Sequence, residues 1–355
     1  MKNKLKHVNL IFIFIVFAFN FIPHNLVDTQ FNKNQSSKLS ASATNLKIVT
    51  SIAVPYDLVR QIAGSDADIE SIVDSTTDVH SFTGPTSNQI NNMIAADVIF
   101  AMGVPGAEPW LADVVEDNEL EGKMVYLGNV SEDGYADPLL DDSKNPHIWM
   151  NPNVVKEMVN LTTNKLIELD VSNQAFFEAN NATFQSDLDD LLTNIENNKT
   201  AYFNGMKIVV NHPAFFYLFD LLGLNRLASI ESQSSGYSGQ SAVLEIINLI
   251  EEQEEEVLLV TSPQHSATDA YEIARETSSK IAQMSAIPGV YEHYSLGEYD
   301  VSDYISMIEY CIWSLRNPTD PPEDTIPGFN LLIVIGSIGI TAFIVMFSIK
   351  RRMSL

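Results

Sequence analysis

The chain has 355 residues, of which 45% are hydrophobic, and its formal net charge is −26. A chain this apolar can bury the cores of roughly two domains, which excludes wholesale disorder, and a chain this acidic lacks the basic face that nucleic acid requires. The single cysteine, Cys311, excludes an internal disulfide, so any zinc site would be built from histidine and carboxylate.

Residues 1–28 begin with alternating lysines and continue into an apolar run from Leu10 to Ile22. This order is typical of a secretory signal peptide, and an uncleaved N-terminal anchor is the alternative. Residues 29–45 are rich in Asn, Ser and Gln and predict a polar spacer.

The body of the chain, residues 46–316, alternates short apolar runs with helical patterns. The runs are 47–52, 69–73, 97–101, 124–127, 207–210, 227–230, 257–261 and 281–284. Continuous apolar runs that alternate with helices predict parallel sheets covered on both faces. We therefore expect an α/β fold with two lobes, 46–171 and 201–316, each with a mainly parallel sheet.

Residues 172–200 lie between the two groups of runs and contain neither Gly nor Pro. They predict one long helix that begins near Ser172, a residue type favoured at helix starts. A helix of this length can bridge two lobes and hold them rigidly. An ordinary surface helix of one lobe is the alternative.

The C-terminal part of the chain has the pattern of a membrane anchor. Residues 317–328 form a proline-rich acidic stalk, and residues 329–349 are apolar without a single charge. The basic tail 350–355 follows, and it is expected on the cytoplasmic side of a transmembrane helix. The sequence therefore predicts a single-pass protein of the cell membrane with its body outside the cell.

Three histidines lie where a ligand site is expected. His80 and His212 each follow a predicted strand, and the carboxyl ends of strands in open α/β sheets face the ligand crevice. His147 stands between two prolines just ahead of a helix predicted to begin near Asn153, which indicates a preset loop.

Four ordered motifs resemble the solute-binding proteins of zinc and manganese ABC importers. They are VHSFTGPTSN at 79–88, AADVIFAMGVPGAEPWL at 95–111, NPHIWMNP at 145–152 and NHPAFFYLF at 211–219. The resemblance covers residues 46–315. The C-terminal anchor further resembles the tethered receptors of archaeal surfaces.

This resemblance implies two α/β lobes joined by one long rigid helix, with the metal held between the lobes. His80 and His147 fall on the ligands of the first lobe, and His212 falls on a ligand of the second. Three imidazoles suit Zn²⁺, whereas Mn²⁺ prefers oxygen ligands. We therefore expect a monomeric receptor that passes Zn²⁺, rather than Mn²⁺, to the permease of an ABC transporter.

The fourth ligand is where the chain departs from the family pattern. The family's second-lobe acidic ligand aligns with Ser285, and Ser262 replaces another acid. His265 is the candidate compensating ligand, with water or an acid such as Asp78 as alternatives. An exposed loop residue without a ligand role is the other interpretation of His265.

Two other functions fit parts of the same pattern. Three histidines with an open fourth position also describe a zinc hydrolase, but the sequence has no HExxH and no GxSxG motif, so we do not expect an enzyme. A surface adhesion protein with a structural metal is the other alternative.

Overall fold

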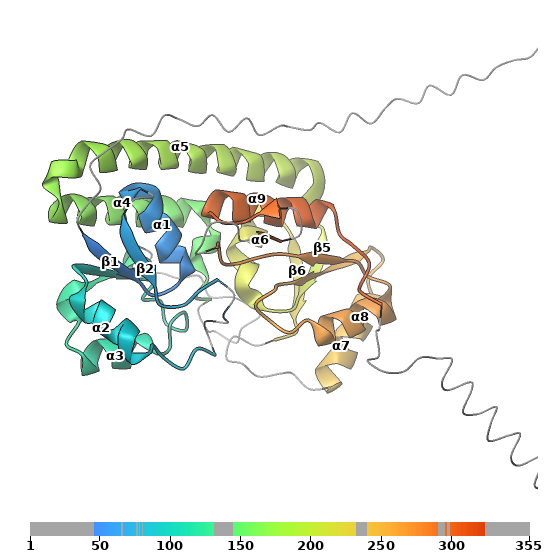
Figure 1. Cartoon of the computed structure of the whole chain (residues 1–355). Coiled ribbons are helices and arrows are strands. Elements are labelled where there is room, and N and C mark those ends of the chain that lie inside the picture. Colours follow the sequence, from blue (N-terminus) through green and yellow to red (C-terminus); the bar gives the residue numbers. More distant parts are fainter. Residues whose placement is uncertain are drawn as a thin grey trace, which may run out of the picture. The chain divides into compact units, whose positions relative to one another are not determined.

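The computed structural model describes residues 46–64, 67–75, 77, 79, 81–130, 145–231, 240–289, 295–296, 299–323 (Figure 1). The predicted signal segment 1–28, the spacer 29–45, the end of the stalk, the membrane span 329–349 and the tail 350–355 lie outside these residues. Within the described ranges, no helix is long and apolar enough to cross a membrane.

The first lobe is built on a four-stranded sheet in the order β2-β1-β3-β4, with every pair parallel. Its strands are β1 (Lys47–Thr50), β2 (Asp68–Ser71), β3 (Val98–Ala101) and β4 (Met124–Tyr126). The helices of this lobe are α1 (Ala53–Ala63), α2 (Ser87–Ala95) and α3 (Leu111–Asp117). The central strand β3 is buried at every residue, as expected for a strand covered on both faces.

The second lobe repeats the arrangement with a parallel sheet in the order β6-β5-β7-β8. Its strands are β5 (Lys207–Val210), β6 (Asn225–Ser229), β7 (Val257–Thr261) and β8 (Ile281–Gln283). Its helices are α6 (Phe216–Leu222), α7 (Gln240–Glu251), α8 (Thr268–Thr277) and α9 (Tyr304–Arg316), and a short antiparallel pair joins β9 (Ser295–Leu296) to β10 (Tyr299–Asp300). The expected α/β fold with two parallel sheets is confirmed.

One long helix, α5 (Gln174–Asn198), follows α4 (Pro152–Leu169) and packs against helices of both lobes. It contacts α1 and α4 on the side of the first lobe and α6 and α9 on the side of the second, as Figure 1 shows along its length. The helix starts at Gln174, two residues after Ser172, but Ser172 does not cap it, because Ser172 lies in a separate 3-10 turn and its hydroxyl donates to Asp170. Asn173 precedes the helix instead.

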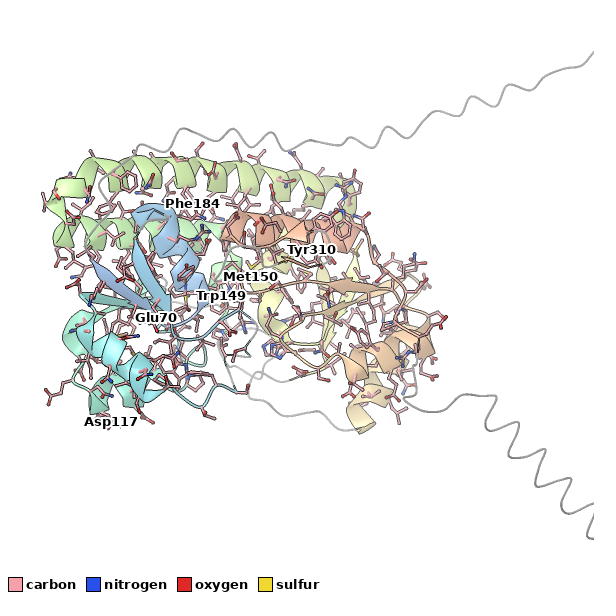
Figure 2. The ribbon with its side chains drawn as sticks, viewed as in Figure 1. Glu70, Asp117, Trp149, Met150, Phe184 and Tyr310 are labelled. Carbon is pink, nitrogen blue, oxygen red and sulfur yellow. The ribbon has the colours of Figure 1, made fainter. Side chains whose placement is uncertain are left out.

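Trp149 lies between the two lobes (Figure 2) and is 1% exposed. Its indole Nε1 donates to the carbonyl oxygen of Ala286 in the second lobe at 2.7 Å, and its own carbonyl accepts from the hydroxyl of Tyr304 at 2.7 Å. The main-chain nitrogen of Tyr304 in turn donates to Asp57 of α1 at 2.8 Å. Buried hydrogen bonds therefore join the lobes directly, in addition to the long helix.

The start of the predicted stalk packs against the second lobe. Thr319 pairs with Ile281 at the edge of the sheet, with main-chain hydrogen bonds of 2.8 and 2.9 Å in the two directions. The guanidinium of Arg275 also donates to the carbonyl oxygen of Pro322 at 3.3 Å. The described stalk residues thus follow β8 instead of leaving the lobe at residue 317.

Candidate metal centre

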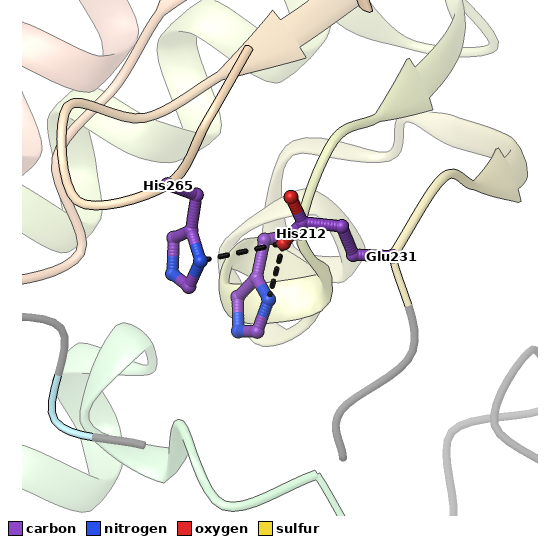
Figure 3. Close-up of side chains that lie close together, drawn as sticks. All are labelled: His212, Glu231 and His265. Atoms are coloured by element: carbon purple, nitrogen blue, oxygen red, sulfur yellow. Dashed lines mark ion pairs between the residues drawn. The ribbon is translucent and has the colours of Figure 1, made fainter. Parts of the chain in front are cut away.

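Three side chains that can ligate a metal meet at the carboxyl ends of three neighbouring strands of the second lobe. Glu231 follows β6, His212 follows β5, and His265 lies in the turn after β7. Because parallel strands end at one edge of a sheet, the strand order places the three side chains side by side (Figure 3).

Glu231 faces both imidazoles of this cluster. Its Oε2 lies 3.4 Å from Nδ1 of His212 and 3.3 Å from Nδ1 of His265. The two rings are stacked, with their centroids 3.8 Å apart and an interplanar angle of 11°. Its other oxygen, Oε1, accepts from the amide nitrogen of Asn211 at 3.0 Å.

The electrostatics of the cluster keep Glu231 ionised. Burial by itself would raise the pKa of this carboxyl, but hydrogen bonds from His212 and His265 and the charge of these histidines lower the pKa to about 2. The pair of imidazoles is therefore held against one fixed negative charge.

His147 approaches the cluster from the loop that precedes α4. Its ring meets the ring of His212 edge to face, with centroids 5.4 Å apart. Its Nδ1 lies 2.8 Å from Oδ1 of Asn145, which also accepts from the main-chain nitrogen of His147 at 3.0 Å. The imidazole of His147 is thus fixed by its own loop before any ion binds.

A small cavity lies between the lobes beside these histidines. Its lining consists of Val79, His147, Trp149, Ala214, Ser262, Gln264, His265, Ala286 and Ile287. The cavity takes residues from both lobes, which is the placement expected of an ion held between them.

Ser285 is fully buried next to this cavity and is engaged in hydrogen bonds. Its hydroxyl donates to the carbonyl oxygen of Ile287 at 2.7 Å and accepts from Nε2 of Gln264 at 3.2 Å. Gln264 also donates to the carbonyl oxygen of Ser75 in the first lobe at 3.3 Å. The hydroxyl of Ser285 therefore contributes to the packing between loops.

Of the predicted ligands, the structure brings His147, His212 and His265 together, whereas His80 and Asp78 lie outside the described residues. The interpretation of His265 as an exposed loop residue is wrong, because its side chain is only 13% exposed. Sequence reasoning missed Glu231. Since it directly follows a predicted strand, the rule that singled out His80 and His212 would also have found it.

Two parallel α/β lobes joined by a long helix, with candidate ligands at the edge between them, define a bilobed solute-binding protein. Residues 48–317 match the family described as zinc-uptake complex component A, periplasmic, and the chain belongs to this family.

Relatives and solved structures agree with this assignment. The manganese-binding lipoprotein MntA of Halalkalibacterium halodurans is 28% identical over 213 residues, 59% of this chain and 69% of MntA. A putative metal-binding protein of Thermotoga maritima is 29% identical, over 66% of this chain and 81% of the relative. The manganese ABC transporter substrate-binding lipoprotein PsaA of Streptococcus pneumoniae is 29% identical, but the match spans only 53% of its length.

The fold itself recurs in solved structures of low sequence identity. A crystal structure of ZnuA superposes with a TM-score of 0.63 at 20% identity, over 78% of this chain and 99% of ZnuA. The periplasmic zinc-binding protein TroA of Treponema pallidum gives a TM-score of 0.67 at 17% identity, over 77% of this chain and 98% of TroA.

Proposed function

We propose that this protein binds a divalent metal ion between its lobes and delivers it to an ABC-type importer. The observation that carries the proposal is the convergence of His147 from the first lobe with His212 and His265 from the second. An ion held by ligands from two lobes couples its binding to the position of the lobes, which an importer can recognise.

The proposed ion is Zn²⁺, held by His80, His147 and His212, with His265 as the candidate fourth ligand. Imidazole nitrogen suits zinc, and zinc sites are most often four-coordinate. The relatives do not decide the ion, since MntA and PsaA are named for manganese and TroA for zinc. The preference rests on the imidazoles of this chain.

The proposed location is the outer face of the cell membrane, with residues 329–349 as a single-pass anchor. The apolar run and the basic residues that follow it support this topology. An importer permease is then the partner, and we propose a monomeric receptor rather than an enzyme.

Metal analysis of the purified full-length chain tests the proposal. We expect close to one zinc per chain and none in the variant that combines His80→Ala, His147→Ala and His212→Ala. When manganese is titrated into the zinc-loaded protein, zinc should stay bound. Equal zinc content in wild type and the triple variant would overturn the proposal.

A surface adhesion role is the second candidate. The laminin-binding protein Lmb of Streptococcus agalactiae, described as having adhesin and metal transporting activity, shares the fold with a TM-score of 0.62 at 18% identity. Deletion of the gene separates the two roles. Unchanged growth in zinc-limited medium would favour adhesion, whereas slower growth that added zinc restores would favour transport.

A further inference from the structure

Glu231 contacts two imidazoles through the same ring nitrogen. The Oε2 atom of its carboxylate faces Nδ1 of His212 and Nδ1 of His265 at 3.4 and 3.3 Å. A carboxylate can only accept hydrogen bonds, so a neutral imidazole that faces it is held with its proton on Nδ1. In both histidines Nε2 is then the nitrogen with the lone pair.

The two rings lie nearly parallel. They are stacked with an interplanar angle of 11°, and both present the edge opposite Nδ1 to the same side (Figure 3). In His147, too, an oxygen faces Nδ1, since this atom lies 2.8 Å from Oδ1 of Asn145 in the same loop. Each of these imidazoles thus has an oxygen at Nδ1.

The carboxylate of Glu231 is held from two sides. Its Oε2 faces the two imidazoles. The second oxygen of Glu231 is held by Asn211, whose amide nitrogen also donates to the carbonyl oxygen of Ser266 at 3.0 Å. Asn211 and the two imidazoles together therefore fix the orientation of the carboxylate.

We infer that Glu231 is a positioning residue that fixes His212 and His265 in one tautomer, so that both bind the ion through Nε2. The inference rests on the proposed metal function and deepens it. Glu231 also supplies a negative charge beside the ion, which Ser285 does not supply. A carboxylate that holds a ligating histidine typically changes metal affinity 10–100-fold when it is replaced.

The first test is the contribution of Glu231 to zinc affinity. The affinity of the full-length chain is measured by competition with a chelating dye. We expect Glu231→Gln to weaken zinc binding about 10–100-fold. The matched control is Glu252→Gln, which removes the same charge at an exposed position just after α7 and should leave affinity unchanged. Equal affinity of wild type and Glu231→Gln would overturn the inference while leaving the proposed function intact.

The ring tautomers test the positioning directly and need no metal. In metal-free protein labelled with ¹⁵N-histidine, we expect His212 and His265 in the Nδ1–H form, with resonances assigned through His212→Gln and His265→Gln. In Glu231→Gln at least one of them should shift towards the Nε2–H form. If both rings carry the proton on Nε2 in the wild type, the inference fails whether or not the protein binds zinc.

X-ray absorption at the zinc edge separates positioning from ligation. A positioning role predicts the same number of imidazole and oxygen scatterers in wild type and in Glu231→Gln. Loss of an oxygen scatterer in the variant would show that Glu231 is itself a ligand and would overturn the inference.

Discussion

The side-chain amide of Asn145 donates a 2.6 Å hydrogen bond to the carbonyl oxygen of Pro213. This contact joins the loop that carries His147 to the loop that carries His212, across 68 residues of sequence. A second contact, from the hydroxyl of Tyr217 to the carbonyl oxygen of Asn145 at 2.6 Å, holds the same pair of loops. The candidate ligands of the two lobes are therefore linked through buried protein groups as well as through any shared ion.

Substitutions at Asn145 should separate the two roles of its side chain, as the acceptor for His147 and as the donor to Pro213. Asn145→Ala removes the acceptor at Nδ1 of His147 and the donor at Pro213, so we expect zinc affinity to fall about 10–100-fold and stability to fall by about 1–3 kcal/mol. Asn145→Asp keeps an acceptor for His147 but loses the amide donor, so its stability should fall with a smaller loss of affinity. Urea unfolding and dye competition measure the two quantities, and weaker zinc binding by Asn145→Asp than by Asn145→Ala would contradict this account.

Trp149 should be among the residues most sensitive to substitution. Trp149→Phe leaves the buried carbonyl oxygen of Ala286 without its donor and opens a space between the lobes. We expect a loss of about 2–4 kcal/mol in the free energy of unfolding. The control is Trp313→Phe on α9, since Trp313 is 39% exposed and should tolerate the change. Equal losses in the two variants would contradict the proposed role of the buried contact.

Protonation of Asp57 should raise the free energy of unfolding in mild acid relative to neutral pH. Burial raises the pKa of this carboxyl to about 6 against the opposing effect of Arg60, whose guanidinium lies 2.7 Å away. The folded state therefore binds a proton more tightly than the unfolded state, whose pKa is 3.8. This contribution to stability is fully present below pH 3.8 and is lost as the pH rises through about 6. The difference is on the order of 3 kcal/mol.

Unfolding in urea at a series of pH values checks this prediction. The free energy of unfolding of the wild type should rise between pH 7 and pH 5 relative to that of Asp57→Asn, which has no proton to bind at this position. The comparison of the two proteins removes the contribution of other titrating groups. Parallel curves would contradict the raised pKa of Asp57.

The features that could be predicted from the sequence are those written in local patterns. Residues 257–260 are all apolar and Thr261 is β-branched, and together they form the buried strand β7 within the predicted bounds. Residues 172–200 lack Gly and Pro, and they contain the helix α5 that packs on both lobes. Periodicity and turn residues are enough for such elements because neighbours along the chain determine them.

The candidate site was harder to predict because its contacts connect distant parts of the chain. Glu231 directly follows a predicted strand, but only the strand order shows that it lies beside His212 and His265. Ser285 has no local signal at all, and its hydrogen bonds to Gln264 and Ile287 follow from how two loops pack. Residue identity alone could not distinguish a missing ligand from a packing residue.

The final prediction concerns the start of the stalk, where Thr319 pairs with Ile281 of β8. Thr319→Pro removes the main-chain N–H that donates to the carbonyl oxygen of Ile281, and proline is poorly accommodated opposite a paired strand. We expect the amide of Ile281, which donates to Thr319, to exchange with deuterium faster in this variant, because the bridge opens. Thr319→Ala keeps both main-chain hydrogen bonds and should exchange like the wild type. Mass spectrometry of the peptide that contains Ile281 makes the measurement, and unchanged exchange in Thr319→Pro would mean that the stalk does not protect the edge of β8.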